Sequence, residues 1–204
     1  MICIITGDIV GSRKIKDSWL LSLKNALKVV SDQNNTRWEI FRGDSFQVQV
    51  EPENAIRTAA YLKACIRLNK PADVRMGIGI GEVKSKRKKL SESSGDAFVN
   101  SGAAFDSLKQ AKVNLAIKTD SADFDEEINV LIKLSLIAMD SWGIVAAEMV
   151  KLALENENRL QSELAALSGR TQPLVSGALK RANYSELMEM DKLYRKKLNQ
   201  MLLK

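Results

Sequence analysis

The amino-acid sequence predicts an α+β protein in which a sheet with helices is followed by a region of helices alone. Up to about residue 120, short runs rich in β-branched and aromatic residues alternate with amphipathic stretches. Beyond that point only the helical spacing of apolar residues recurs. The 204 residues are 45% hydrophobic and 27% charged, a composition that is ordinary for one sizeable globular core or two small ones.

The elements of the first half follow an order that specifies a topology. The pattern predicts strands at residues 2–6, 38–41, 46–50, 73–83 and 113–119, and helices at residues 17–33, 53–68 and 97–111. The order β-α-β-β-α-β, then α-β, is the split βαβ signature of a ferredoxin-like fold. We therefore expect residues 1–120 to form an antiparallel sheet with helices on one face.

The second half contains no predicted strand. Its apolar spacing predicts helices at residues 124–142, 144–158, 160–168, 171–182 and 184–204. No Gly/Ser-rich linker separates the two halves. The boundary between a first domain of residues 1–120 and a helical domain of residues 121–204 is therefore not sharp in the sequence.

Composition narrows the chemistry that the chain can perform. It contains no histidine, which excludes Ser-His-Asp triads and histidine-ligated zinc. The net charge of +6 permits a polyanionic partner. The N-terminal MICIITGDIV is typical of a strand rather than of a signal peptide, and no apolar run approaches the roughly 18 residues of a membrane span. We expect a cytoplasmic protein without a membrane partner, with Cys3 and Cys65 as buried free thiols.

A tight turn of Arg42, Gly43, Asp44 and Ser45 joins two predicted strands. One interpretation is that Asp44 only closes this turn. In a ferredoxin-like sheet, however, the first strand is central and pairs with the hairpin, so Asp8 at its end can converge with Asp44. Two carboxylates at adjacent strand ends suit a Mg²⁺ ion that also binds substrate phosphates. Asp8 and Asp44 are therefore candidate metal ligands.

Two glycine-containing segments have different interpretations. In GDIVGS, Gly11 and Ser12 approach the start of the next helix, where free backbone N–H groups can receive a phosphate. The GIGIG segment at residues 77–81 continues a strand and lacks the third glycine of a dinucleotide fingerprint. We interpret GIGIG as a site of close packing.

Four segments in order, GDIVGSR, FRGDSFQV, VRMGIGIGEV and SSGDAFVNSGAAFDSL, resemble the core of class III nucleotide cyclase domains over about residues 1–118. The chain is more closely similar to the SatD family, whose members look like degenerate relatives of that palm-type domain. The resemblance implies a nucleotide-cyclase-type sheet in which Asp8 and Asp44 hold the metal. It also implies that Ile9 lends a backbone carbonyl to the metal.

The same resemblance implies which residues contact a ligand. At two positions, however, this chain departs from the pattern of the cyclases. Val10 and Gly11 match the phosphate loop, and Asn100 matches the asparagine that orients the ribose. Ala104 stands where the cyclases carry an arginine that stabilises the transition state, and Ile40 stands where they carry a base-reading lysine. Binding could therefore persist without catalysis.

Other cations could replace the missing arginine. The candidates are Arg13, Arg42 and the basic KSKRKK segment at residues 84–89. Arg42 belongs to the predicted ligand-binding set for this reason, and Ser12 belongs to it because of its place in the GDIVGS loop. The alternative for the KSKRKK segment is a solvated loop.

The segment at about residues 160–182 resembles the helix-turn-helix of bacterial regulators. Ala165 is small where two helices must touch, and Gly169 follows at a turn that needs positive φ. The alternative is a pair of packed helices in a bundle. The exposed face that would bind DNA consists of Thr171, Gln172, Ser176, Lys180 and Arg181.

Three functions are compatible with these patterns. The first is a one-component transcriptional regulator, in which the palm-type domain senses a nucleotide or phosphorylated ligand and the helix-turn-helix of a homodimer binds DNA. Its final helix, residues 184–203, is predicted to pair the two copies. The second is a Mg²⁺-dependent nucleotidyl cyclase or transferase, and the third is a non-enzymatic oligomerisation protein. Salt-dependent binding of duplex DNA distinguishes the first from the third.

We predict that cyclase activity is absent or very weak, because Ala104 and Ile40 remove contacts to the transition state and to the base. Purified protein incubated with ATP or GTP and Mg²⁺ should form cyclic nucleotide at well below about one turnover per second. Product formation at that rate or faster would contradict this expectation. Arg42→Ala would then test whether Arg42 supplies the missing charge.

Overall fold

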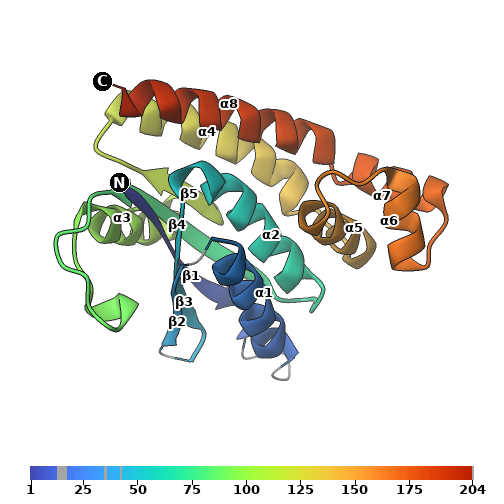
Figure 1. The fold of residues 1–204 in the computed structure, drawn as a ribbon, viewed down its shortest axis with the longest axis horizontal. Coiled ribbons are helices and arrows are strands. Elements are labelled where there is room, and N and C mark those ends of the chain that lie inside the picture. Colours follow the sequence, from blue (N-terminus) through green and yellow to red (C-terminus); the bar gives the residue numbers. More distant parts are fainter. Residues whose placement is uncertain (13–17, 35, 42, 204) are drawn as a thin grey trace.

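In the computed structural model, residues 1–12, 18–34, 36–41 and 43–203 are described (Figure 1). This part of the chain forms one sheet of five strands and eight α-helices, with two short 3-10 helices, η2 (Pro52–Asn54) and η3 (Leu90–Glu92). The predicted α+β class is confirmed.

The sheet is mixed. Its strands are β1 (Ile2–Val10), β2 (Trp38–Phe41), β3 (Ser45–Val50), β4 (Asp73–Gly81) and β5 (Leu115–Lys118). They lie in the order β2-β3-β1-β4-β5. The pairs β2–β3, β3–β1 and β1–β4 are antiparallel, whereas β5 runs parallel to β4. The order of the first four strands confirms the ferredoxin-like prediction, and the α-β unit that follows adds the parallel strand.

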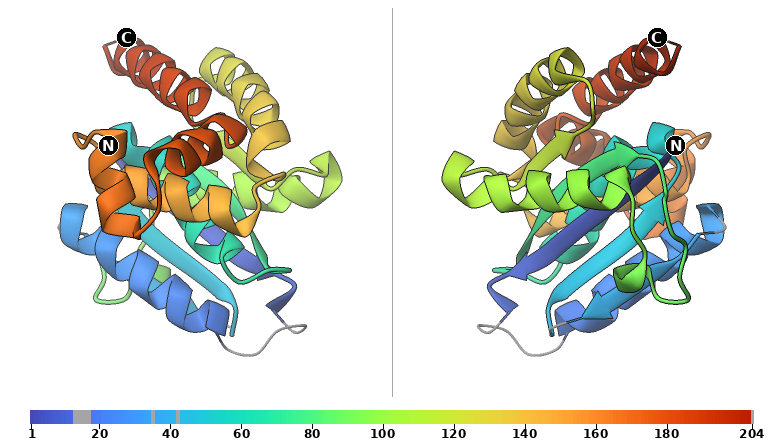
Figure 2. Two further views of the ribbon diagram at one scale, coloured as in Figure 1. Left: turned by 90° about the vertical axis from the view of Figure 1, so that its right-hand side faces the viewer. Right: turned by 90° about the vertical axis from the view of Figure 1, so that its left-hand side faces the viewer.

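Three helices of the first half lie against the sheet: α1 (Ser18–Asn34), α2 (Ala55–Arg67) and α3 (Asp96–Ala111). Helices α1 and α2 cover one face, whereas α3 covers the other, as the two views of Figure 2 show. The structure differs here from the expectation that the helices share one face. The reason lies in β4, which offers a packing surface on both sides.

Successive residues of a strand point to opposite sides, so β4 has one face of large apolar side chains and one face on which three glycines follow Arg75. Gly77, Gly79 and Gly81 form the second face, and α3 lies directly on it. A Cβ added at Gly79 would lie 2.0 Å from the backbone N of Ser101, and one at Gly77 would lie 2.3 Å from the backbone N of Phe105. The prediction of close packing in GIGIG is confirmed. The first face contributes to the main core with Val74, Met76, Ile78 and Ile80.

The second half is helical, as predicted. Its elements are α4 (Ala122–Met139), α5 (Ile144–Glu155), α6 (Gln161–Ser168), α7 (Gln172–Arg181) and α8 (Tyr184–Leu202). Helices α4 and α8 lie side by side at the top of Figure 1, and α5 packs against α2. None of the helices in the described ranges is long and apolar enough to span a bilayer.

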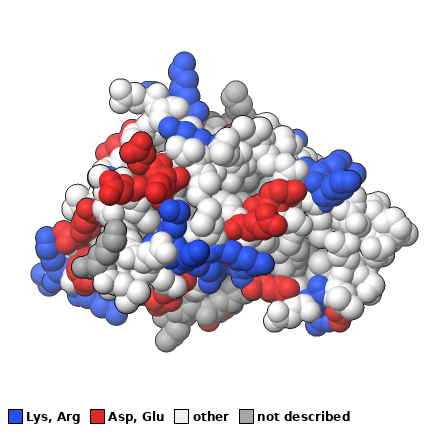
Figure 3. Space-filling view, turned by 90° about the horizontal axis from the view of Figure 1, so that it is seen from above, with Lys and Arg blue, Asp and Glu red and all other residues white. Residues whose placement is uncertain are grey.

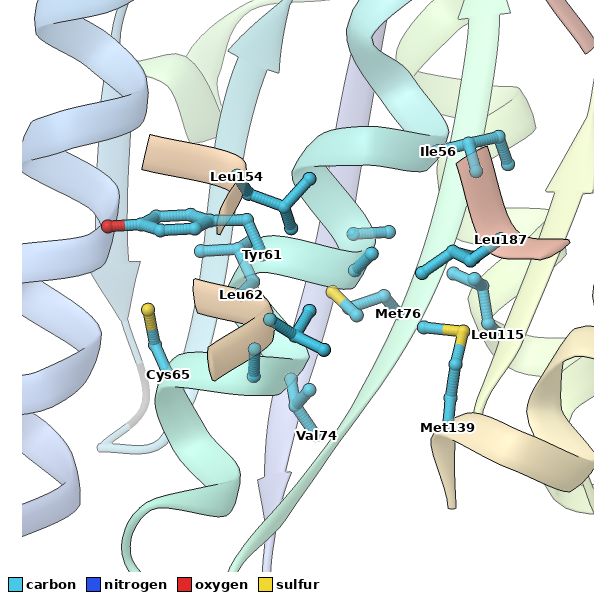
Figure 4. Close-up of a cluster of buried hydrophobic side chains, with 14 of the residues drawn as sticks. Ile56, Tyr61, Leu62, Cys65, Val74, Met76, Leu115, Met139, Leu154 and Leu187 are labelled. Atoms are coloured by element: carbon cyan, nitrogen blue, oxygen red, sulfur yellow. The ribbon is translucent and has the colours of Figure 1, made fainter. Parts of the chain in front are cut away.

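One hydrophobic core joins the two halves. The largest buried cluster contains Leu62 of α2 and Met76 of β4 together with Met139 of α4, Leu154 of α5 and Leu187 of α8 (Figure 4). The apolar side chains are not divided into separate cores at residue 120. The division into domains of residues 1–120 and 121–204 stays a prediction. In the structure the two parts share one hydrophobic interior.

A buried ionic cluster fixes the same junction. Lys63 of α2 has only 1% of its side chain exposed, and its Nζ lies 2.8 Å from Oδ1 of Asp73 and 2.6 Å from Oδ1 of Asp140. Arg67 donates to Asp73 and to the backbone carbonyl of Trp142. Because a buried charge is costly unless it is paired, these contacts hold the turn between α4 and α5 against the sheet.

We predict that Gly79→Ala lowers the free energy of unfolding by about 3 kcal/mol, since the new methyl group meets the backbone of α3 rather than a flexible side chain. The matched control is Gly102→Ala within α3, where nothing lies within 4 Å of the new methyl group. That control should gain about 0.5–1 kcal/mol from helix propensity. Urea unfolding measures both, and equal stability of the two variants would contradict close packing at Gly79.

Candidate functional site

The face of the sheet that carries α3 contains an open groove of about 540 Å³, which we call the β1–α3 groove. This volume lies in the range of about 300–1,000 Å³ that is typical of small-molecule sites. The lining surface is about equally polar and apolar and includes two aromatic rings. It consists of Thr6, Gly7, Phe41, Ser45, Gln47, Ser91, Gly102, Phe105 and Asp106. The groove is therefore a candidate ligand-binding site.

A chain of polar side chains crosses the floor of this groove. Oγ1 of Thr6 lies 3.0 Å from Oγ of Ser101 and accepts a hydrogen bond from Nε2 of Gln47 at 3.1 Å. Oε1 of Gln47 is buried, and no donor for it is found among the described residues. A buried acceptor without a donor costs about 1–3 kcal/mol. Because Oε1 is inaccessible, a ligand in the groove could use this acceptor only if the Gln47 side chain changed its conformation.

Asp8 extends the polar surface beyond Thr6, since residues two apart in a strand share a face. Arg75, its neighbour on β4, donates from Nε to Oδ1 at 2.9 Å and from Nη2 to Oδ2 at 2.5 Å. The pair is partly exposed, with 19% of the Asp8 and 34% of the Arg75 side chain accessible. The pKa of Arg75 is raised, chiefly by its hydrogen bonds to Asp8 and further by the charges of Asp8 and Asp44.

Asp44 reaches the same end of the sheet from the turn between β2 and β3. Its backbone carbonyl accepts from N of Ile9 at 3.2 Å, and its Oδ2 accepts from Oγ of Ser12 at 2.7 Å. Asp8 stands opposite Ser45, the residue after Asp44. The structure thus brings four of the predicted site residues, Asp8, Ile9, Ser12 and Asp44, to one end of β1.

The predicted phosphate loop is described only in part. Val10 ends β1 with 39% of its surface exposed, and Gly11 follows with φ +80, a left-handed backbone that favours glycine. Arg42 lies outside the described residues, as do residues 13–17, which join Ser12 to α1. The phosphate-binding role of this loop and of Arg42 stays a prediction.

Asn100 is not brought to the groove. Only 6% of its surface is exposed, and its Nδ2 donates to the carbonyl of Ile80 at 2.9 Å and to Oδ1 of Asp120 at 3.2 Å. Ile80 pairs with Cys3, so Asn100 lies toward the opposite end of β1 from Asp8. Its amide holds α3 to the end of β4. A ribose-binding role stays a prediction, and it would require the release of this amide.

The arrangement of Asp8 and Asp44 does not suit Mg²⁺ while Arg75 is in place. Arg75 engages both oxygens of Asp8, and Ser12 donates to one oxygen of Asp44. Across the described ranges, no group of three or more Asp, Glu, Cys or His side chains could hold a metal ion. The guanidinium occupies the side of Asp8 that a cation would need. A magnesium site therefore stays a prediction that depends on displacement of Arg75.

Sequence reasoning did not identify Arg75 as part of the site. It stands between Val74 and Met76 in a strand that otherwise reads as buried. A charged residue at such a position needs a partner, because an unpaired buried charge is costly. This signal indicates that Arg75 has a partner, but the sequence does not identify Asp8 as that partner.

A second candidate site is formed by α5, α6 and α7. Helix α6 ends at Ser168, Gly169 has φ +65, and α7 begins at Gln172. Helix α5 packs against both α6 and α7, and Ala165 and Val175 are buried there as part of the main core. The turn and the packing agree with a three-helix variant of the helix-turn-helix.

The face of α7 that would meet DNA is accessible. Of its predicted contact residues, Ser176 is half-buried and four are exposed, namely Thr171, Gln172, Lys180 and Arg181. Ser176 and Lys180 border a hollow of about 440 Å³ that Glu157 and Glu186 also line. These carboxylates reduce the positive potential beside Lys180. Figure 3 likewise shows basic and acidic groups interspersed on the face seen from above.

We predict that Arg75→Ala raises the affinity for Mn²⁺ by about tenfold or more, because it frees both oxygens of Asp8 and removes a positive charge beside the site. Titration calorimetry with Mn²⁺ compares the variant with the wild type. The control is Arg75→Ala combined with Asp8→Asn, which should lose the gain. An unchanged affinity in Arg75→Ala would show that Asp8 and Asp44 do not form a latent cation site.

A comparison with curated proteins found no match to this chain. A comparison with protein families gave a match to the model of the SatD family over residues 1–197. The match includes β1 with Asp8, the groove, and the helices up to most of α8. Because it extends over nearly the whole length, this protein belongs to the SatD family.

Proposed function

We propose that this protein is a one-component transcriptional regulator of the cytoplasm. The sheet half senses a nucleotide or a similar phosphorylated ligand in the β1–α3 groove, and α7 binds DNA as the recognition helix. The observation that carries the proposal is the accessible polar face of α7 after the left-handed turn at Gly169. Catalysis is not part of the proposal.

The groove supports the choice of ligand class. Phe41 and Phe105 border it, and aromatic rings can stack on a nucleobase. Polar side chains of Thr6, Ser45 and Gln47 also line it, and the Asp8–Arg75 pair lies beyond the Thr6 end of the groove. A phosphate near that end would compete with Asp8 for the guanidinium of Arg75, since arginine binds carboxylate and phosphate with the same two-pronged geometry.

The contacts of α2 offer a physical route between the two sites. Arg57 forms ion pairs with Glu157, in the loop between α5 and α6, and with Asp191 of α8 at 3.4 Å. Tyr61 donates to Glu155 of α5 at 2.6 Å. Because α2 lies on the sheet and also holds these helices, a shift of the sheet on ligand binding would reach α6 and α7.

The test is the affinity for duplex DNA measured against salt concentration. Wild type should show salt-sensitive binding, and Lys180→Ala with Arg181→Ala should weaken it about tenfold or more and reduce the salt slope by about 2. The matched control is Lys24→Ala with Lys28→Ala, which removes the same charge from exposed positions on α1. DNA binding that is absent in wild type, or unchanged in the α7 variant, would refute the assignment of α7.

The sensing half of the proposal has its own readout. A nucleotide that acts as effector should change DNA affinity by about 5–150-fold, the usual range of coupling between two sites. Phe105→Ala in the groove should abolish this response while leaving the DNA affinity without nucleotide unchanged. If no nucleoside monophosphate, diphosphate or triphosphate changes the DNA affinity, the proposed sensing role is refuted. The proposed DNA-binding role is then unaffected.

A further inference from the structure

We infer that the β1–α3 groove binds a ribonucleotide along one face of α3. The phosphate lies between Arg75 and Lys109, and the ribose hydroxyls donate to Asp106. The base lies against Phe105, in the space beside Gly102. This inference rests on the proposed function, because it names the ligand of the same groove and the contact that each part of the ligand makes.

One face of α3 carries four residues at helical spacing. Gly102, Phe105 and Asp106 line the groove, and Lys109 stands three residues after Asp106 and seven after Gly102. Residues at positions i, i+3, i+4 and i+7 share one face of a helix. Lys109 therefore extends this wall of the groove by about one turn, or 5.4 Å. In the right-hand view of Figure 2, α3 lies in front of the sheet.

The packing of α3 on β4 brings Lys109 to Arg75. The three glycines of β4, at every second position, meet the α3 backbone at every fourth position, ending with Gly77 against Phe105. Two residues of a strand and four residues of a helix both span about 6–7 Å. The next pair in this register is Arg75 with Lys109. A second cation thus stands at the end of the groove where the Asp8–Arg75 pair lies.

Both cations have N–H groups to offer. Arg75 binds Asp8 through Nε and Nη2, and no described residue accepts from its Nη1. Lys109 is exposed, and its ammonium group has no partner among the described residues. Charged donors on two adjacent elements suit a phosphate group. Because Asp8 holds the other edge of the guanidinium, a phosphate can bind at Nη1 before Asp8 is displaced.

Asp106 supplies an acceptor about one turn before Lys109. Its carboxylate is exposed and has no hydrogen-bond or ion-pair partner in the part of the chain that the structure describes. An ionised carboxylate only accepts hydrogen bonds, and ribose hydroxyls can donate to it, as they do to the acidic residue of dinucleotide-binding folds. Side chains three residues apart on a helix are about 5–6 Å apart at Cβ. One sugar phosphate can therefore reach both Asp106 and Lys109.

The base has both a surface and a space. Phe105 borders the groove from α3 and Phe41 borders it from the hairpin, and an aromatic ring can stack on any base. Gly102 precedes Asp106 by four residues, and nothing lies within 4 Å of a Cβ placed there. From Lys109 to Gly102, this face presents a cation, a carboxylate, a ring and an open space. That is the order of phosphate, ribose and base in a nucleotide.

Calorimetric titration of the full chain with ATP, GTP, CTP and UTP, in the presence of EDTA, tests the phosphate end. Lys109→Ala should raise the dissociation constant of the triphosphate that binds most tightly about tenfold or more, because a charged hydrogen bond is lost. The matched control is Lys133→Ala, which removes the same charge from an exposed position on α4 and should bind as wild type does. Equal affinity of Lys109→Ala and wild type would overturn the phosphate site.

The ratio of the affinities for this ribonucleotide and its 2′-deoxy analogue tests Asp106. Wild type should bind the ribonucleotide about tenfold more tightly, and Asp106→Ala should reduce the ratio to about one. The ratio reports the ribose contact even where loss of a negative charge strengthens the binding of both nucleotides. A wild type without this preference, or a preference that survives Asp106→Ala, would contradict the assignment of Asp106.

Gly102→Leu tests the place of the base, because the new side chain fills the open space. Its Cβ meets no other atom, so urea unfolding should show a stability at least equal to that of wild type, whereas nucleotide binding should be lost. The matched control is Ala103→Leu, at the adjacent exposed position of α3, which should bind normally. A Gly102→Leu protein that binds nucleotide as wild type does would place the base elsewhere and overturn this part of the inference.

These measurements separate the inference from the proposed function. Nucleotide binding that depends on neither Lys109 nor Asp106 would refute the inference and leave the sensing role standing. Binding as described, without any change in DNA affinity, would refute the sensing role and leave the inference standing. A wild type that binds none of the four triphosphates would refute both, and the affinity of α7 for DNA is measured separately.

Discussion

The contact between the glycine face of β4 and the backbone of α3 is the constraint on which the rest of the structure depends. Gly77, Gly79 and Gly81 leave no side chains between strand and helix, so α3 lies directly on one half of the sheet. From there Ser101 can reach Thr6 on β1. On the other half, η3 contacts the hairpin strands on that face, where N of Ser91 donates to Glu39, and the β1–α3 groove lies between η3 and α3. Side chains at the three glycines would lift α3 and remove the walls of this groove.

The opposite face of the sheet determines where the helical half lies. Helix α2 presents apolar side chains to both β4 and α5, and its Lys63 and Arg67 bind carboxylate and carbonyl groups from the strand and from the turn after α4. These charges are stable in the interior only when all partners are present. The helix-turn-helix unit and the groove are consequently parts of one packed body. A change at either site must be accommodated by a shared core, which is the physical condition for coupling between them.

The end of β1 combines features of a metal site with features that replace the metal. Asp8 and Asp44 are neighbours in space, but Arg75 supplies a positive charge to Asp8 and Ser12 supplies a donor to Asp44. Arginine gives a permanent charge with fixed geometry, whereas Mg²⁺ would add a Lewis acid. The pairing of Asp8 with Arg75 agrees with Ala104, which stands where the resemblance to cyclase domains implies an arginine. Both features fit the proposed binding of a phosphorylated ligand without catalysis.

The sequence by itself determined the features that depend on local physics. Periodicity and turn residues identified the helices and strands in order, the glycines of GIGIG indicated close packing, and Gly169 indicated the turn before α7. Strand order followed, since few topologies suit β-α-β-β-α-β. The tertiary structure alone decided which face α3 covers, that Arg75 binds Asp8, that the Asn100 amide is bound to β4, and that both halves share one core. These features depend on which residues distant in sequence come into contact, and no local pattern specifies the partner of a buried charge or amide.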